Sequence, residues 1–298
     1  MERRKFLSST ALSLAALALS GNKSFAAFAQ SAPYQFKPLR RNVGMFAEQG
    51  GTIAWLSNKD GIVVVDAEFP APANDLIAEL KKQSDKPFQY LINTHHHGDH
   101  TSGNISFKGL AKHVVAQDNS LKNQKATAQE AKTEDKQLYP DITFTDRWKT
   151  KIGDEKIKTY YWGAGHTNGD SMIHFENANI VHTGDLVFNR MFPYVDRKYG
   201  ASVVNWAQVL EKAQKQFDKD TLFVFGHAAD PEKVTGTLDD LKAMQNYMEK
   251  LAAFVQAGIN AGKTREDILA ATAIPGVTDW QGQGIQRSLT AAYEELTL

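Results

Sequence analysis

The sequence contains no cysteine, and this absence excludes several kinds of chemistry at once. Without thiols the chain can form no disulfide, no thiolate zinc site and no cysteine nucleophile. Glycine and proline number 21 and 9 in 298 residues, which is too few for a collagen-like or low-complexity chain. Basic and acidic residues balance at 34 each, so the strongly basic composition of a typical nucleic-acid-binding protein is missing as well.

Long apolar runs are also missing beyond the first thirty residues, so we expect no later segment to cross a membrane. Apolar residues nevertheless make up 42% of the chain, which excludes intrinsic disorder as its general state. The length is sufficient for one large domain or two small ones with a substantial core.

The first 29 residues have the pattern of an export signal. The pair Arg3-Arg4 precedes an apolar run over 11–20, and Ala27-Phe28-Ala29 provides a cleavage site with small residues. The paired arginines followed by Phe-Leu resemble a twin-arginine signal; an ordinary secretory signal and an uncleaved anchor are the alternatives. We therefore expect recognition by the export machinery, a periplasmic location without stable membrane insertion, and a mature chain 30–298. Because the leader contains four basic residues and one acidic residue, that chain would have a formal charge of −3.

The order of strand-like and helical segments predicts an α/β (α+β) fold with two sheets face to face and helices outside them. Strand patterns occupy 52–56, 62–66, 88–93, 157–162, 172–175, 180–182 and 222–225. Helical spacing occupies 73–82, 118–135, 203–217, 237–257 and 264–272. We expect a single domain over 30–298 that is helical from about 237 onwards.

Histidine and aspartate clusters follow four of the predicted strands. The clusters are His95-His96-His97-Gly98-Asp99-His100, His166, Asp185 and His227. Loops at strand ends are where a rigid sheet positions functional side chains. Imidazoles and carboxylates without thiolates are ligands suited to zinc, with iron or manganese as alternatives. The clusters therefore predict a metal site.

The spacing within the first cluster predicts two groups of ligands. In an extended loop, the alternating residues His95, His97 and Asp99 share a side, while His96 points away. A turn at Gly98 then brings His100 round, so that Asp99 and His100 face a second ion. A surface run of histidines that binds nothing is the alternative, but the three later clusters at strand ends favour a site.

Four segments together resemble the metallo-β-lactamase superfamily, in order from about residue 42 to 228. They are Thr94-His95-His96-His97-Gly98-Asp99-His100, Gly165-His166-Thr167-Asn168-Gly169-Asp170, His182-Thr183-Gly184-Asp185 and Gly226-His227. The resemblance implies a four-layer αββα sandwich, here with extra C-terminal helices, and a metal pair at one edge of the sheets. By position it implies a first ion held by His95, His97 and His166, a second held by Asp99, His100 and His227, and Asp185 as the bridge between them.

Asp185 indicates a branch of that superfamily. The resemblance implies Cys or Ser at this position in most true lactamases, whereas a bridging Asp is typical of glyoxalase II-like hydrolases. We therefore expect an exported hydrolase with about two zinc ions per chain, in which a metal-bridging hydroxide attacks an ester, thioester, lactone or related bond of a small molecule. The alternatives are a β-lactam-hydrolysing enzyme, a mononuclear iron oxygenase of the persulfide-dioxygenase type, and a metal-binding protein without activity.

Several other side chains have expected roles around this centre. Asp99 is the expected catalytic group, which would orient the nucleophile and pass its proton to the leaving group. Outer support of the ligands is expected from Asp66, Thr94 and His182, although simple packing is an equal alternative for His182. Substrate contacts are expected from Arg190 or Arg197 and from Tyr194; a loop that only packs on the C-terminal helices is the alternative.

Overall fold

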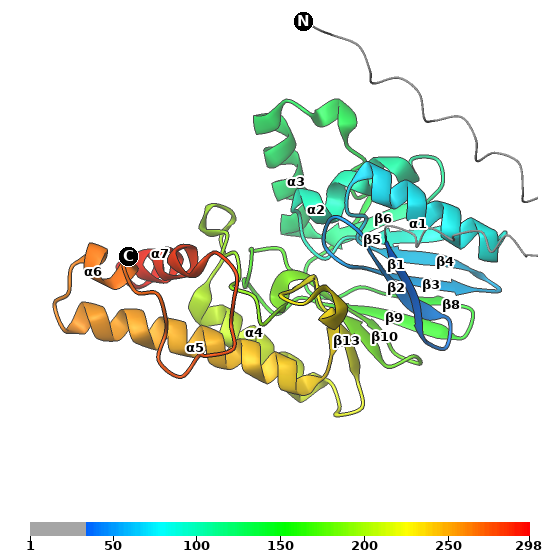
Figure 1. Cartoon of the computed structure of the whole chain (residues 1–298). Helices are drawn as coiled ribbons and strands as arrows, with labels where there is room; N and C mark the ends of the chain where they lie inside the picture. Colours follow the sequence, from blue (N-terminus) through cyan, green and yellow to red (C-terminus); the bar gives the residue numbers. More distant parts are fainter. Residues whose placement is uncertain (1–33) are drawn as a thin grey trace, which may run out of the picture. The chain divides into compact units, whose positions relative to one another are not determined.

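Two sheets packed face to face, with helices on both outer faces, form the fold of residues 34–298, which are the residues that the computed structural model describes (Figure 1). This is the αββα sandwich that the sequence predicts. The expected export signal at 1–29 lies outside the described residues.

The first sheet has seven strands in chain order. They are β1 (Gln35–Arg40), β2 (Val43–Ala47), β3 (Ile53–Asn58), β4 (Gly61–Val65), β5 (Phe88–Ile92), β6 (His113–Gln117) and β7 (Ile142–Phe144). The pairs from β1 to β4 are antiparallel, and those from β4 to β7 are parallel. Because β4 and β5 run in the same direction, the residues that follow them, Asp66 and the His95–His100 loop, emerge at one edge of the sheet.

The second sheet brings the later clusters to its own edge. Its strand order is β15 (Thr235–Gly236), β13 (Leu222–Val224), β11 (Ile180–His182), β10 (Met172–Phe175), β9 (Glu155–Tyr160) and β8 (Lys149–Ile152). β11 and β13 are parallel neighbours, so Asp185 and His227 both follow strand ends at the same edge. There the short strands β12 (Phe188–Asn189) and β14 (His227–Ala228) also pair in parallel.

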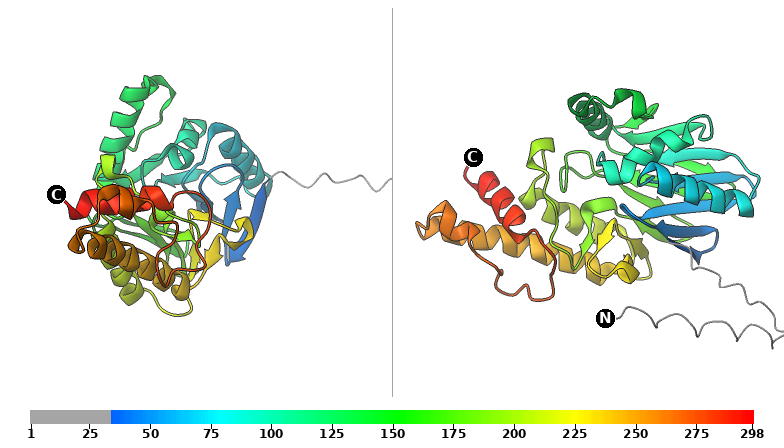
Figure 2. Two further views of the ribbon diagram at one scale, coloured as in Figure 1. Left: turned by 60° about the vertical axis from the view of Figure 1, so that its left-hand side comes forward. Right: turned by 45° about the horizontal axis from the view of Figure 1, so that its top comes forward.

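The helices lie outside the two sheets, and those at the C-terminal end of the chain extend beyond the second sheet (Figure 2). They are α1 (Pro70–Gln83), α2 (Gly98–Thr101), α3 (Asp118–Ala131), α4 (Val203–Gln216), α5 (Leu238–Asn260), α6 (Arg265–Leu269) and α7 (Ile285–Leu296). Single 3-10 turns are η1 (Ser102–Phe107), η2 (Glu134–Lys136), η3 (Gly184–Leu186), η4 (Arg197–Tyr199) and η5 (Pro231–Lys233). The long α5 begins at a capping box, in which Thr237 and Asp240 each accept a backbone N–H of the other.

Three apolar clusters fill the spaces between the four layers. The middle cluster joins the inner faces of the two sheets, for example Val63 and Val65 of β4 with Ile173 of β10. A second cluster packs α1 on the outer face of the first sheet, and the third packs α4, α5 and α7 on the second sheet. Alternate residues of a strand serve opposite faces, which explains why Val63 and Val64 belong to different clusters.

Most predicted elements are present, and the differences are one helix end, one C-terminal helix and two short strands. The helix predicted over 264–272 ends at Leu269, because the chain then turns into a loop that contains Pro275. The sequence analysis did not identify α7, although Ile285, Leu289 and Ala292 are buried at helical spacing. It also missed strands β7 and β8, which are only three and four residues long.

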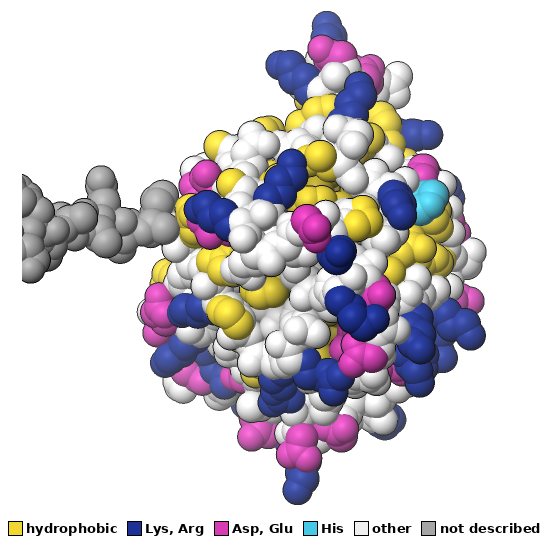
Figure 3. All heavy atoms as spheres, turned by 90° about the vertical axis from the view of Figure 1, so that its right-hand side faces the viewer, with side chains coloured by type: hydrophobic (Ala, Val, Ile, Leu, Met, Phe, Trp, Pro, Cys, Tyr) yellow, Lys and Arg dark blue, Asp and Glu magenta, His cyan; other side chains and the backbone are white. Residues whose placement is uncertain are grey.

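Within residues 34–298, none of the helices combines the length and the apolar character needed to span a bilayer. On the face opposite the C-terminal helices, Lys and Arg side chains alternate with Asp and Glu and form no continuous basic stripe (Figure 3). This face therefore lacks the electrostatic pattern of a typical nucleic-acid interface.

Trp206 of α4 links the helical layer to the metal-site edge. Substitution of this residue therefore tests how much the packing between them contributes to stability. It is fully buried, and its indole N–H donates to the carbonyl of Leu186 at 3.0 Å. Trp206→Phe should lower the free energy of unfolding by about 2 kcal/mol, since it leaves a void and an unpaired carbonyl. Val204→Ala on the exposed side of the same helix should cost less than about 0.5 kcal/mol in the same urea titration. Equal losses in the two variants would contradict this account.

Candidate metal centre

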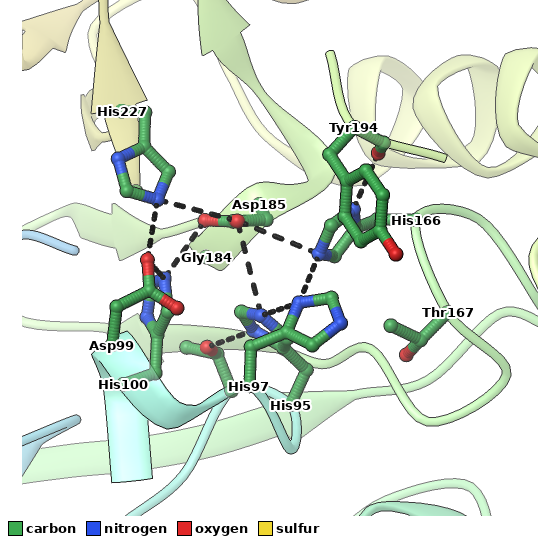
Figure 4. Close-up of polar contacts among 12 residues, drawn as sticks. His95, His97, Asp99, His100, His166, Thr167, Gly184, Asp185, Tyr194 and His227 are labelled. Carbon is green, nitrogen blue, oxygen red and sulfur yellow. Dashed lines mark hydrogen bonds and ion pairs between the residues drawn. The ribbon is translucent and has the colours of Figure 1, made fainter. Parts of the chain in front are cut away.

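Three imidazoles and one carboxylate converge at the shared edge of the two sheets (Figure 4). His95 and His97 follow β5, His166 follows β9, and Asp185 lies in the turn after β11. His97 Nδ1 is 3.1 Å from His95 Nε2 and 2.8 Å from His166 Nε2. Asp185 Oδ2 is 3.8 Å from His95 Nε2 and 3.4 Å from His166 Nε2. The four ligand atoms lie within 4.8 Å of one another, which suits ligands of a single ion.

A second group of side chains faces the same aspartate. Asp99 and His100 lie in α2, and His227 begins β14. Asp99 Oδ2 is 3.1 Å from His227 Nε2 and 3.8 Å from His100 Nε2. Asp185 approaches this group too, with Oδ1 3.0 Å from His100 Nε2 and Oδ2 3.4 Å from His227 Nε2. The structure thus brings together all seven residues expected at a metal pair, with Asp185 between the two groups.

In each of two imidazoles of the first group, a hydrogen bond at the nitrogen that points away from the site determines that the other nitrogen can bind a metal. The carbonyl of Tyr194 accepts from His166 Nδ1 at 2.7 Å, and Asp196 accepts from His97 Nε2 at 2.8 Å. Both rings then present a lone pair at the opposite nitrogen. His97 Nδ1 and His166 Nε2 are therefore two acceptors facing each other at 2.8 Å, an arrangement that a cation between them would stabilise.

Asp66 orients one imidazole ring in each of the two groups. Its carboxylate accepts from His100 Nδ1 at 2.8 Å and from the hydroxyl of Thr94 at 2.7 Å. Because the Thr94 hydroxyl donates to Asp66, its oxygen is left to accept from His95 Nδ1 at 3.0 Å. His95 Nε2 and His100 Nε2 consequently point into the site with their lone pairs available, as the expected outer-support roles of Asp66 and Thr94 require.

Two buried atoms of the site have no hydrogen-bond partner among the described residues. They are His100 Nε2 and Asp185 Oδ1, which lie 3.0 Å apart without hydrogen-bond geometry. Gly226 allows this position of Asp185, because a Cβ at residue 226 would lie 2.0 Å from Oδ1. Unpaired buried polar atoms are costly, and a metal ion that both atoms bind would remove that cost. The residues present therefore fit a pair of divalent ions.

The charges around Asp185 favour positive charge in the second group. Burial raises the pKa of Asp185, but His227, His100 and His95 together hold it well below its usual range. Burial lowers the pKa of His227, but Asp185 and Asp99 raise it to about 9. In the first group, burial dominates and lowers the pKa of His166 to about 4, so that ring is neutral at pH 7. Neutral imidazoles and ionised carboxylates are the forms that bind metal, so metal binding at the second group would require His227 to lose its proton.

His182 supports the centre from behind, between the two sheets. Its Nε2 donates to the carbonyl of Thr52 at 2.7 Å, and its Nδ1 accepts the backbone N–H of Gly184 at 3.0 Å. It contacts no ligand atom directly, but it holds the residue before Asp185. Its outer-support role stays a prediction.

The residues expected to contact substrate differ in their surroundings. Tyr194 covers the first group, with its ring centre 5.6 Å from that of His97 (Figure 4). Arg190 instead forms ion pairs with Asp240 at 3.5 Å and Asp279 at 3.0 Å. Arg197 is likewise engaged, with the carbonyl of Ala201 and with Glu295. Neither guanidinium is free to bind a substrate without losing these partners.

His96 belongs to neither ligand group around Asp185. It is buried, its ring lies against Tyr199, and its Nε2 is 3.8 Å from Asp196 Oδ2. This agrees with the expectation that it points away from the metal pair. Asp170, which accepts the backbone N–H and the hydroxyl of Thr167, shapes the turn after His166.

Asp196, the partner of His97 Nε2, was not predicted from the sequence. Asp196 is nearly a hundred positions from His97 in the sequence, and it lies in a loop without a motif. Its backbone N–H donates to the carbonyl of His166 at 3.1 Å, so the same residue contacts two members of the first group. Only the folded chain reveals this connection.

Sequence analysis also missed Glu68, which organises the loop between β2 and β3. Its buried carboxylate accepts three backbone N–H groups, from Glu48 at 3.0 Å, Gln49 at 2.8 Å and Gly50 at 2.7 Å. The loop continues into Gly51, where a Cβ would lie 2.0 Å from the His100 ring. Glu68 therefore holds this loop against the second ligand group.

The same loop has backbone contacts with the second group. The N–H of Gly51 donates to the carbonyl of Asp99 at 3.0 Å, and the N–H of Thr52 donates to that of Gly226 at 2.9 Å. Asp99 is itself a member of the group, and Gly226 precedes His227. The loop thus connects two strand ends that carry ligands of one expected ion.

Comparisons with known proteins agree on one fold. The sequence model of the metallo-beta-lactamase superfamily matches residues 48–244. The chain is 26% identical over 204 residues to metallo-beta-lactamase IND-1 of Chryseobacterium indologenes, across 64% of this chain and 80% of that protein. It is 28% identical over 141 residues to hydroxyacylglutathione hydrolase of Maricaulis maris, across 45% and 49%. A solved metallo-beta-lactamase from Pontibacter korlensis has the same fold, with a TM-score of 0.60 at 20% identity over 72% and 99% of the two chains.

Glu68→Gln should weaken zinc binding at the second group about 10-fold or more, because an amide NH2 would replace one acceptor of the three loop N–H groups. Binding at the first group should change little. Competition with a chromophoric chelator measures both affinities. Glu155→Gln is the matched control, since Glu155 is also buried and accepts the backbone N–H of Asn177 at 2.8 Å, at the start of β9. Equal weakening at both groups, or in both variants, would refute the role of Glu68.

Proposed function

This chain belongs to the metallo-β-lactamase superfamily, and we propose that it is a dinuclear zinc hydrolase of esters, thioesters, lactones or related small molecules. The observation that carries the proposal is the position of Asp185, whose two oxygens face both groups of imidazoles at 3.0 to 3.8 Å. A shared carboxylate between two nitrogen-rich groups is what a metal pair requires.

The ligand chemistry supports zinc for both ions. The first group offers three imidazoles, and the second offers two imidazoles and a carboxylate, with no thiolate in the chain. Zinc accepts such nitrogen and oxygen sets, and catalytic zinc sites have three protein ligands and one open position. Iron and manganese bind the same atom types, so metal analysis has to distinguish them.

A carboxylate at position 185, where most lactamases are expected to have Cys or Ser, supports the hydrolase branch over lactam hydrolysis. Asp185 stands at the position between the two groups, and relatives of both kinds, a lactamase and a hydroxyacylglutathione hydrolase, are similar to this chain. We therefore propose ester or thioester hydrolysis first, with β-lactam hydrolysis as the second candidate, favoured by the similarity to IND-1 across 80% of that protein.

The protein's own residues would transfer the proton of the nucleophile to the leaving group and position the reacting groups. Bound zinc would supply Lewis acidity and a nucleophilic hydroxide at neutral pH. Burial raises the pKa of Asp99, but His100 and His227 hold it at about 2, so its carboxylate is ionised at neutral pH. Its side chain is about one-third exposed, at 32%, and can therefore reach an incoming molecule. Asp99 would orient the nucleophile through a hydrogen bond and transfer its proton to the leaving group.

We also propose that the protein acts outside the cytoplasm. The paired arginines at Arg3-Arg4, the apolar run 11–20 and the small residues around Ala29 support export. The absence of cysteine is compatible with an oxidising compartment. Cell fractionation with an antibody against the mature chain tests this location.

Metal analysis is the first test of the proposed function. Protein purified from its host without added metal should contain about two zinc ions per chain by mass spectrometry. Asp185→Ala should lower this to one ion or fewer and reduce ester or thioester hydrolysis more than about 100-fold, because both groups lose a ligand. Asp154→Ala, which removes an exposed carboxylate paired with Arg41, should keep both ions and full activity.

Two results would overturn the proposal. One iron per chain, with oxygen uptake in the presence of sulfur substrates, would indicate an oxygenase instead. Two zinc ions without hydrolysis of any ester, thioester, lactone, lactam or phosphodiester would leave a metal-binding protein.

A further inference from the structure

A cavity of about 360 Å³ lies between the segment 194–198 and α7. On one side it is lined by Tyr194 and the residues that follow, and on the other by Gln286, Arg287 and Glu294 of α7. Helix α7 lies outside the region 48–244 that the superfamily shares. One wall of the cavity therefore lies within the matched region and the other lies beyond it.

Tyr194 connects this cavity to the metal centre. Its carbonyl accepts from His166 Nδ1 at 2.7 Å, and its ring centre lies 5.6 Å from that of His97. The side chain is 44% exposed and also lines the cavity. A molecule whose reacting bond lies at the ligand groups would thus reach the cavity by passing over the Tyr194 ring.

Most charged side chains around the cavity already have a partner. Asp196 accepts from His97, Arg197 pairs with Glu295, and Lys198 pairs with Glu130. Arg287 forms no ion pair within residues 34–298, and neither does Glu294. The two charges available to a ligand are therefore one guanidinium and one carboxylate on the same helix.

These two charges lie at different distances from the metal centre. Ser288, next to Arg287, donates its hydroxyl to the carbonyl of Pro193 at 3.0 Å, which holds this turn of α7 beside Tyr194. Glu294 follows Arg287 by seven residues, about 10 Å farther along the helix. Of the two side chains without an ion pair, Arg287 therefore lies at the end of the cavity nearer the metal centre.

We propose that this cavity is a subsite for an acidic group, and that the preferred substrates are esters or thioesters with a carboxylate remote from the reacting carbonyl. The guanidinium of Arg287 would bind that carboxylate through two parallel hydrogen bonds, and Tyr194 would line the path between them. The substrate class rests on the proposed hydrolase function. Arg287 would thus take the role expected of Arg190 or Arg197, which form ion pairs with Asp279 and Glu295.

The test compares two synthetic esters with acyl chains of six carbons, 4-nitrophenyl hexanoate and mono-4-nitrophenyl adipate. The zinc-loaded full chain should hydrolyse the adipate ester with a kcat/KM about 10-fold higher, after subtraction of the uncatalysed rate. Arg287→Ala should abolish this preference, mainly through a higher KM for the adipate ester, and Arg287→Lys should retain part of it. Arg265→Ala, which removes an exposed arginine of α6 that does not line the cavity, should retain all of it.

Calorimetry of adipate and hexanoate binding to the same proteins separates the two proposals. Hydrolysis of both esters with a preference that Arg287→Ala leaves unchanged would overturn the subsite and leave the hydrolase. Failure to hydrolyse either ester, with adipate binding that depends on Arg287, would overturn the ester-hydrolysis proposal and support the subsite. If hydrolysis and Arg287-dependent binding are both absent, both proposals are wrong.

Discussion

The hydrogen bonds of Asp66 are the constraint on which the whole centre depends. This fully buried carboxylate directly follows β4 and accepts from the backbone of Thr94, the hydroxyl of Thr94 and the ring of His100. Through Thr94 it also determines which nitrogen of His95 faces the site. One side chain therefore orients a ligand in each of the two groups. The positive φ of Asp66, 66°, is a strained conformation that these bonds help to maintain.

The two groups of ligands depend on different parts of the chain for support. The first is held by the loop around Tyr194 and Asp196, which follows Asp185 and leads into α4. The second is held by the β2–β3 loop, which Glu68 positions against His100 and Asp99. Because the supporting segments differ, a substitution in one of them is expected to affect one ion more than the other.

Motifs at strand ends were predictable because their residues are close in the sequence or follow a recognisable strand. The spacing of His95, His97 and Asp99 encodes which side chains share a face, and Asp185 and His227 follow two apolar strands. Asp196 and Glu68 were not predictable, since each acts through a partner that is distant in sequence or through backbone N–H groups. Strand β7 was not predicted because it has only three residues. The pattern of α7, with buried positions at helical spacing over twelve residues, is present in the sequence but was not recognised.

The sequence by itself determined the kind of chemistry available to this protein. A chain without thiols, with imidazoles and carboxylates after apolar strands, presents nitrogen and oxygen ligands at those strand ends and no thiolate. The tertiary structure decided which of these atoms meet, because parallel strands bring distant loops to one edge and outer hydrogen bonds select one nitrogen of each ring. It also decided which cations remain free: Arg190 and Arg197 are paired, whereas Arg287 on a helix distant in the sequence faces the cavity beside the centre. Ion pairing depends on the distances between side chains in the folded protein, and these cannot be read from the spacing of residues in the sequence.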